Sequence, residues 1–292
     1  MFALYALLVI GVAVVIVPFF WMLMTSLMTL GESLNRAWIP AVPQWDNYIR
    51  AWDEANFGEY FVNSIIITVV TVFGILIMST LAAYAFARIK FPGRELIFAL
   101  LLTTLMIPES VTMIPNFLGI RGDVLGPTLL CAPGNAEFMT TIWGTFFPCD
   151  GWINTLQALS IPFMGSAFSI FLLRQFFAQI PWELWDAARI DGAGHLRFLV
   201  QIVLPNSLAP IMTVAIFAFI GAWNSFLWPL IVTTEDTWRP LAVGLYNFVT
   251  DAGSELNLMM AGSVITIVPI LILYFFTQKQ FTEGIVTSGL KG

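Results

Sequence analysis

A single carboxylate, Glu109, interrupts a long apolar stretch of the chain and lies between Pro108 and Ser110. An ionisable residue in a membrane-spanning segment is a candidate functional group, because placing a charge in lipid is costly. The neighbouring proline puts this carboxylate near the outer end of its predicted helix, where water reaches it. We therefore expect an interfacial or helix-breaking role for Glu109 ahead of a direct contact with a substrate.

Two tryptophans and an amide follow one another further along the chain, at Trp223, Asn224 and Trp228. Sugars are held by aromatic faces that stack on C–H groups and by amides that bond hydroxyls, so these three residues are candidates to line a sugar path. Ordinary helix packing, with Asn224 bonded to a neighbouring helix, explains the same residues. The sequence leaves both interpretations open.

Catalytic chemistry is not indicated. His195 is the only histidine, so the chain lacks the base or metal cluster that a membrane-embedded hydrolase needs. It also lacks a glycine-rich phosphate loop and is not predicted to be an ATPase. We expect His195 to be a surface residue, with no metal site and no cofactor bound by this chain.

A charged island lies between two apolar segments, from Ile180 to Pro210. Pro181 suits the first turn of a helix, and Glu183 and Asp186 follow at the positive end of the helix dipole. The pattern predicts a helix from about Pro181 to Ile190. Gly192 then allows a sharp turn in the left-handed conformation, and a second helix is expected from about His195.

The faces of the predicted helix differ in size. Helical spacing puts Leu184, Ala187, Ala188 and Asp191 on one side, and Trp182, Trp185 and Arg189 on another. A knob with one small face suits docking into a groove on another protein. The island is therefore expected to bind a partner.

The composition is that of an integral membrane protein, with 59% hydrophobic and 10% charged residues. A helix needs about 20 apolar residues to cross a bilayer. Runs of this kind predict six spans in one transmembrane domain, at about 4–27, 61–87, 96–117, 151–173, 206–232 and 256–278. We read the first as an uncleaved helix, since it is too long for a signal-peptide core.

Lysine and arginine predict the orientation of these spans. They gather in the loop from Arg88 to Arg94, in the island, and after the last span at Lys279 and Lys291, whereas most acidic residues fall in the alternate loops. The basic regions and both termini are thus expected in the cytoplasm. The net charge of −6 comes from the outer loops and does not suggest nucleic-acid binding.

The outer loop at 120–150 contains both cysteines, Cys131 and Cys149. Thiols on the outer side of a membrane can be oxidised, so a disulfide between them is expected, with two free thiols as the alternative.

The island resembles the cytoplasmic loop of permease subunits in ATP-binding-cassette (ABC) importers. The family pattern is Glu-Ala-Ala, three residues, Gly, nine residues, Ile, one residue, Leu-Pro. The matching positions are Asp186, Ala187, Ala188, Gly192, Ile202, Leu204 and Pro205. Aspartate replaces glutamate, which keeps the charge and shortens its reach by one methylene.

Other stretches resemble the carbohydrate-uptake branch of this family, including AAYAFARIKFPGRE (82–95), LMIPESVTMIP (105–115) and AWNSFLWPLIV (222–232). The resemblance implies an all-α permease of the type I ABC importer fold, with a coupling helix between spans four and five. It implies a coupling loop at 178–205 whose contacts include Asp191.

The implied partners are a second permease subunit, two ATPase subunits that bind ATP and Mg, and an external sugar-binding protein. A non-sugar solute such as a glycerol phosphate ester is an alternative. An ion-coupled secondary transporter is a more distant one, because neither internal repeats nor midplane charges beyond Glu109 are evident.

Overall fold

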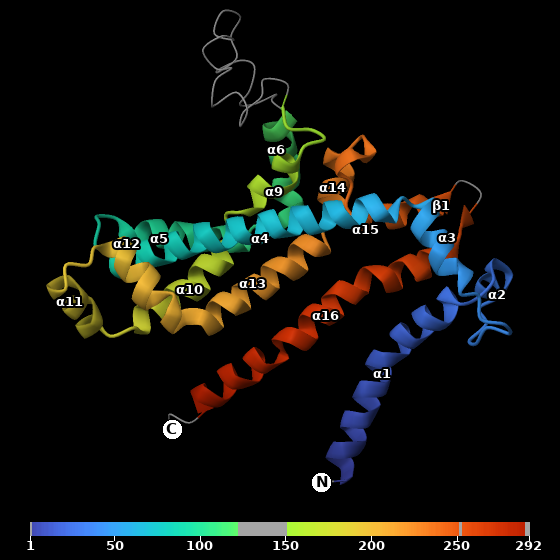
Figure 1. Ribbon diagram of the computed structural model, residues 1–292, viewed down its shortest axis with the longest axis horizontal. Coiled ribbons are helices and arrows are strands. Elements are labelled where there is room, and N and C mark those ends of the chain that lie inside the picture. The colour runs from blue at the N-terminus through green and yellow to red at the C-terminus, as the bar shows by residue number, and fades with distance from the viewer. Residues whose placement is uncertain (1, 122–150, 251–252, 290–292) are drawn as a thin grey trace, which may run out of the picture. The chain divides into compact units, whose positions relative to one another are not determined.

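The structure is a computed structural model that describes residues 2–121, 151–250 and 253–289 (Figure 1). Helices make up most of these residues, as the all-α prediction requires. The one departure is a short antiparallel ribbon that pairs β1 (Val249–Thr250) with β2 (Gly253–Ser254). The chain divides into two compact units, which are described in turn.

The first unit comprises Met1–Ser64 and Arg239–Phe276. Its helices are α1 (Phe2–Ser26), α2 (Leu30–Leu34), α3 (Asp46–Glu54), the first part of α4 (Phe57–Arg88), α15 (Leu241–Gly244), a 3₁₀ turn (Leu245–Phe248) and most of α16 (Leu256–Gly289). The buried rings of Phe57 and Tyr60 fill its core. Gly244 lies against the Tyr60 ring, so close that an added Cβ would be 2.7 Å from a ring carbon. Only glycine permits this approach.

A buried amide closes the loop after α1. The Asn47 side chain donates to the carbonyls of Ser26 and Met28 at 2.9 and 2.8 Å. Its oxygen accepts from the Asn257 amide at 3.3 Å. Because the last carbonyls of a helix have no partner within the helix, Asn47 both terminates α1 and ties it to the start of α16.

The second unit comprises Ile65–Trp238 and Thr277–Gly292. After the rest of α4 it contains α5 (Arg94–Thr103), a 3₁₀ turn (Thr104–Met106), α6 (Glu109–Arg121), α9 (Leu156–Ser160), a 3₁₀ turn (Ile161–Phe163), α10 (Ala167–Gln179), α11 (Trp182–Ile190), α12 (His195–Phe198), a π-helical turn (Leu199–Val203), a 3₁₀ turn (Pro205–Ser207), α13 (Leu208–Trp223), α14 (Leu227–Val232) and a 3₁₀ turn (Asp236–Trp238). In this unit α10 packs against α13 and α5.

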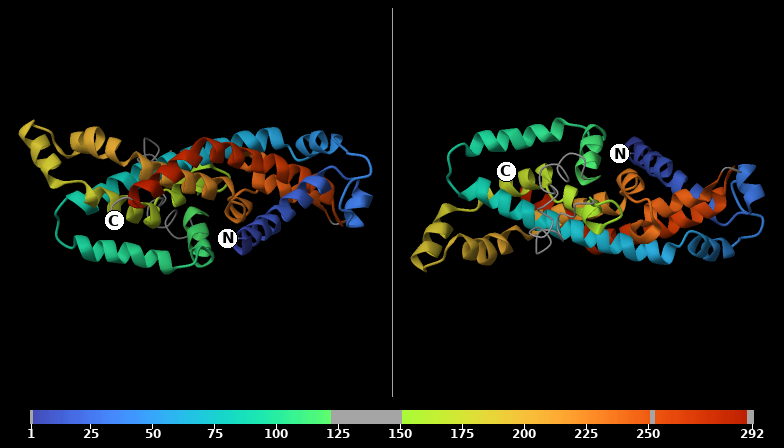
Figure 2. Two further views of the ribbon diagram at one scale, coloured as in Figure 1. Left: turned by 90° about the horizontal axis from the view of Figure 1, so that it is seen from below. Right: turned by 90° about the horizontal axis from the view of Figure 1, so that it is seen from above.

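Three of the predicted spans are broken in the second unit. The stretch from Arg94 to Met106 meets α6 at 104°, and the corner is visible in both views of Figure 2. Pro108 explains the break, because proline lacks an N–H donor and keeps the preceding residue out of the helical region. A milder bend of 44° separates Leu156–Phe163 from α10. The third break, at Asn224–Phe226, separates α13 from α14.

The span predicted over 96–117 is therefore not one straight helix, because the chain turns sharply within it. Four helices in the described residues are long and apolar enough to cross a membrane, at Leu4–Ser26, Phe57–Arg88, Pro205–Trp223 and Leu256–Gln278. The number rises to six if each bent pair forms one span. The count of six stays a prediction.

Candidate functional site

The predicted loop at 178–205 forms a helical hairpin that turns at Gly192. Helix α11 begins directly after Pro181 and has Glu183 in its first turn. It ends in a Schellman motif, in which Ala193 N–H donates to the Ala188 carbonyl at 2.8 Å and Gly192 N–H to the Arg189 carbonyl at 3.0 Å. Gly192 has φ +75°, so the predicted helix and the left-handed glycine are confirmed.

The hairpin presents its small residues differently from the prediction. Ala188 is only 5% exposed and lies in the apolar core with Phe177 and Phe198. Trp185, one turn earlier, packs beside it and stacks on the His195 ring at 4.4 Å. Ala187 and Asp186 remain exposed. The structure thus separates the two alanines, because α11 must bury one face to stay attached to the membrane helices.

The second arm of the hairpin is also anchored in the core. Ile202 and Leu204 pack against the same apolar cluster, and Pro205 begins the turn that leads into α13. Asp191 caps α11 with its backbone and is exposed. Of the residues proposed for partner contact, Asp186, Ala187, Asp191 and Gly192 are exposed. Ala188 is buried and packs in the core beneath them.

Two residues of α4 hold the hairpin, a role that the sequence did not indicate for either of them. The buried Arg88 guanidinium donates to the Phe177 carbonyl at 3.0 Å and to the Ile180 carbonyl. It also lies 4.8 Å from the centre of the Trp182 ring. One turn earlier, the Tyr84 hydroxyl and His195 Nδ1 are 2.8 Å apart. Both arms of the hairpin are therefore fastened to one helix.

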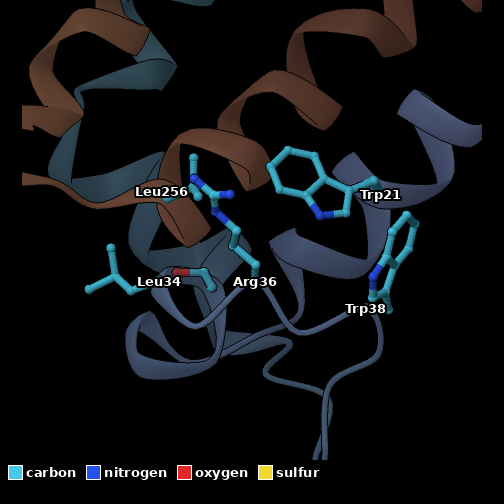
Figure 3. A pocket seen from close by; sticks show the side chains of 6 residues that line it. Trp21, Leu34, Arg36, Trp38 and Leu256 are labelled. Carbon is cyan, nitrogen blue, oxygen red and sulfur yellow. The ribbon is translucent and has the colours of Figure 1, made fainter.

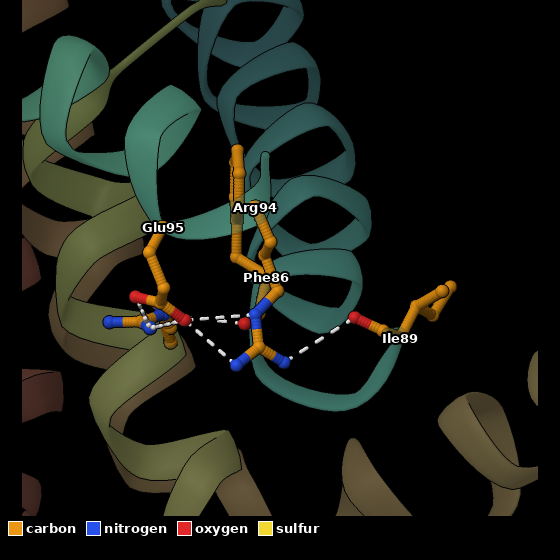
Figure 4. Close-up of polar contacts among 5 residues, drawn as sticks. Phe86, Ile89, Arg94 and Glu95 are labelled. Atoms are coloured by element: carbon orange, nitrogen blue, oxygen red, sulfur yellow. Dashed lines mark hydrogen bonds and ion pairs between the residues drawn. The ribbon is translucent and has the colours of Figure 1, made fainter. Parts of the chain in front are cut away.

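A polar cluster fixes α5 beside α10 (Figure 4). Glu95 lies between two guanidinium groups, 2.7 Å from Arg94 and 3.0 Å from Arg174. The Arg174 guanidinium also covers the Phe98 ring at 3.9 Å. Helix α10, which leads directly into the hairpin, is thus cross-linked to α5.

A cavity of about 410 Å³ lies where the broken spans of the second unit meet. It is lined by Glu109, Ser110, Thr112, Met113, Asn116, Phe163, Gly221, Asn224, Ser225, Phe226, Leu227 and Trp228. Its polar groups come chiefly from the first turns of α6 and from the break between α13 and α14. Irregular backbone at membrane depth is tolerated where it lines such a cavity.

The cavity brings together three of the four residues proposed for a solute path. Glu109, Asn224 and Trp228 line it. Trp228 is held in place by a 2.9 Å hydrogen bond from Nε1 to the Ala158 carbonyl and by edge contact with Phe163. Trp223 does not line the cavity, because it is 3% exposed and stacks on Phe219.

The electrostatics of the cavity are simple. Glu109 is the only charged residue that lines it within the described residues, and Asn116 and Asn224 add amides. No lysine, arginine or histidine of the described residues lines it. The arrangement can donate and accept hydrogen bonds to a hydroxyl-rich ligand, and its one charge is negative.

Cys131 and Cys149 lie outside the residues that the structure describes, as does most of the predicted 120–150 outer loop. The base of that loop is described. Trp152 N–H donates to the Ile120 carbonyl at 2.7 Å, and Gly151 has φ +79°. A backbone hydrogen bond therefore joins the residues on either side of the segment. The disulfide stays a prediction.

Comparison with known proteins matches residues 75–285 to the family described as the binding-protein-dependent transport system inner membrane component. The diacetylchitobiose uptake system permease protein NgcG of Streptomyces coelicolor is 32% identical over 288 residues, which cover 98% of this chain and 87% of the relative. The sn-glycerol-3-phosphate transport system permease protein UgpE of Yersinia pestis bv. Antiqua is 30% identical over 258 residues, covering 86% and 82%.

Among solved structures, a bacterial ABC transporter involved in the import of the acidic polysaccharide alginate has a chain of the same fold. The two superpose with a TM-score of 0.76 at 22% identity, over 95% of each chain. The names of these proteins cover both neutral and acidic solutes.

Proposed function

The chain belongs to the family of binding-protein-dependent transport system inner membrane components, and from this premise we propose that it is the permease subunit of an ATP-driven sugar importer. As a member of that family it is a membrane transport component and not an enzyme. The observation that carries the proposal is the polar cavity at two breaks in the spans, one just before α6 and one just after α13. Such a cavity offers a hydroxylated solute a place within a membrane helix bundle.

The hairpin is the proposed contact with the ATPase. Its exposed surface at Asp186, Ala187 and Asp191 is small and acidic, which suits a preformed groove on a soluble subunit. Movement of the hairpin is passed on through Arg88 and Tyr84, which fasten its two arms to α4. A pull on the hairpin thus moves a membrane helix and does not merely bend a loop.

The proposed assembly contains this chain, a second permease subunit, two ATPase subunits that bind ATP and Mg, and an external binding protein. When the ATPase dimer closes, both hairpins move with it and the pore opens outward. Because the ATPase subunits are cytoplasmic, the proposed assembly places the hairpin and both termini in the cytoplasm. The distribution of lysine and arginine predicts the same orientation.

The cavity favours a neutral solute over an anionic one. An anion within about 4 Å of the Glu109 carboxylate is repelled by up to roughly 4 kcal/mol at an intermediate dielectric constant. No cationic side chain of the described lining offsets this repulsion. We therefore propose a neutral oligosaccharide as the solute, in preference to a glycerol phosphate ester or a uronic-acid polymer.

The decisive experiment is uptake by the complete importer reconstituted in proteoliposomes with its binding protein. Uptake of a neutral oligosaccharide is expected to require ATP inside the vesicles and to be insensitive to ion gradients. Uptake that an ion gradient drives without ATP would identify a secondary transporter and overturn the proposal.

Solute charge is tested with Glu109→Gln. We expect the ratio of uronate-bearing to neutral sugar uptake to rise about tenfold in the variant, because the local repulsion is removed. Comparing this ratio between variant and wild type cancels the preference of the binding protein. Glu59→Gln is the matched control, since Glu59 is an exposed carboxylate that does not line the cavity. An unchanged ratio in Glu109→Gln rules out the charge filter.

A further inference from the structure

A second pocket, of about 650 Å³, lies in the first unit beside the end of α1. It is lined by Trp21, Ser33, Leu34, Arg36, Trp38 and Leu256 (Figure 3). Trp21 belongs to the last part of the apolar span Leu4–Ser26, none of whose window is buried within this chain. In a membrane protein, the end of such a span lies at the level of the lipid headgroups.

Arg36 supplies a free cation to this pocket. Its guanidinium makes no hydrogen bond or ion pair with the residues that the structure describes. Figure 3 shows its side chain reaching from the loop toward Leu256 and Trp21. The backbone at Arg36 has φ +55°, an uncommon conformation for a residue with a β-carbon. Residues in such strained conformations cluster at active sites and ligand clamps.

Glu32, the acidic residue nearest to Arg36 in the sequence, is hydrogen-bonded to the backbone and not to Arg36. Glu32 accepts hydrogen bonds from the backbone N–H groups of Thr29 and Ala41, each at 2.9 Å. These bonds lower the pKa of Glu32, the Ala41 bond most of all, and keep its carboxylate on the backbone. Glu32 therefore shapes the loop that carries Arg36 and Trp38 but does not neutralise Arg36.

The remaining lining matches the chemistry of a membrane surface. Tryptophan is enriched at the boundary between lipid and water, because its ring is apolar and its N–H is a donor. Trp21 and Trp38 lie close to one another on one side of the pocket, and Leu34 and Leu256 lie on the other. We propose that this pocket binds the headgroup of a phospholipid, with Arg36 on the phosphate and Trp21 and Leu256 against the glycerol and upper acyl chains.

The phosphate group alone could also come from a soluble ion. The lining favours a lipid, because four of the six residues are apolar or aromatic and the pocket adjoins an apolar helix that the other described residues of this chain leave uncovered. A guanidinium binds a phosphodiester by paired, charge-assisted hydrogen bonds. The apolar wall adds affinity only for a ligand with hydrocarbon attached.

The test is lipid binding to the purified, delipidated importer, counted by native mass spectrometry. The probes are phosphatidylglycerol, diacylglycerol with the same chains, and inorganic phosphate. We expect the wild type to bind phosphatidylglycerol about tenfold more tightly than diacylglycerol, and to lose this preference in Arg36→Asn. Asparagine is chosen because it tolerates positive φ and so preserves the loop.

Arg50→Asn is the matched control, since Arg50 is an exposed arginine of the same unit that pairs with Glu54 at 3.0 Å. It should bind phosphatidylglycerol as the wild type does. Trp21→Leu keeps the span apolar and should weaken binding severalfold by removing the ring. Full lipid preference in Arg36→Asn overturns the proposal. Phosphate that competes with the lipid at equal concentration overturns the lipid assignment in favour of a soluble anion.

Discussion

The hairpin at 178–205 and the cavity beside Glu109 are built in opposite ways. The hairpin takes its shape from consecutive residues, whose backbone groups are bonded to one another and to Arg88. The cavity collects residues from three separate segments, around Glu109–Asn116, at Phe163 and over Gly221–Trp228. Substitutions in the hairpin should therefore change the shape that a partner meets, whereas substitutions in the cavity should change affinity and leave the shape intact.

The sharpest test of this contrast is Gly192→Val. A β-branched residue is strongly disfavoured at φ +75°, at a cost of about 1–2 kcal/mol. No atom lies within 4 Å of an added Cβ, so the effect comes from the backbone and not from a clash. The turn should leave the left-handed region and lose its Schellman bonds. We expect uptake to be abolished and ATPase copurification to fall, with normal abundance in the membrane.

Gly194→Val is the matched control, because Gly194 has φ −84° and equally open surroundings. Alanine and asparagine at position 192 should form a graded series, with Gly192→Asn nearest to the wild type. If Gly192→Val transports at the wild-type rate and abundance, the hairpin turn is not the coupling element.

Arg88→Met should have the next largest effect. It removes two hydrogen bonds from a guanidinium to the backbone at the end of α10, each worth about 1.5–3 kcal/mol. Methionine keeps much of the volume, so the core remains filled. We expect at least a tenfold loss of uptake and a lower thermal midpoint for the detergent-solubilised subunit. Lys90→Met, at an exposed position two residues on, should be neutral. Equal losses in both variants would mean that Arg88 acts only through its net charge.

The contrast between local and distant partners also explains what the sequence predicts. The helix at 181–190 and the left-handed Gly192 can be predicted, because the residues that determine them lie within one short stretch. The roles of Tyr84 and Arg88 are not, since their partners His195 and Phe177 lie 111 and 89 residues away. Both residues fall in the stretch 82–95, which the family resemblance marks without assigning a role.

Burial is a second property that sequence patterns alone do not reveal. Helical spacing alone cannot decide which face of α11 is inward, so Ala188 was expected beside Ala187 on the exposed face. The break at Pro108 was visible in the sequence as a proline, but the length of the apolar run favoured a single span. The same is true of Trp223, because its residue type does not show whether its ring packs against Phe219 or lines the cavity.

Asn224→Ala tests the cavity side of the comparison. Its side chain lines the cavity, and its backbone φ of −87° suits alanine, so the fold should be unaffected. Loss of one hydrogen bond to a solute hydroxyl should reduce uptake by about threefold to tenfold. ATPase copurification should not change. Thr213→Ala, on the same helix and bonded to the Ala209 carbonyl, is the control. Parallel losses of uptake and ATPase binding in Asn224→Ala would erase the distinction between the two regions.

The smallest expected effect lies at the second anchor of the hairpin, Tyr84. Tyr84→Phe keeps the ring, which lies edge-on to His195 at 5.8 Å, and removes only the hydroxyl bond of 2.8 Å. One neutral hydrogen bond is worth about 1 kcal/mol. We therefore expect uptake to fall about twofold and the thermal midpoint to fall slightly. Tyr5→Phe, on an exposed residue of α1, should change neither.

A double-mutant cycle of Tyr84→Phe with His195→Phe isolates this bond. His195→Phe preserves the stacking on Trp185, so the coupling between the two changes reports the hydrogen bond alone. We expect a coupling energy of about 0.5–1 kcal/mol in the free energy of unfolding. Additive changes would show that ring packing, and not the Tyr84 to His195 hydrogen bond, fastens the second arm of the hairpin to α4. Among the residues that the structure describes, Arg88 would then be the remaining polar link between the hairpin and α4.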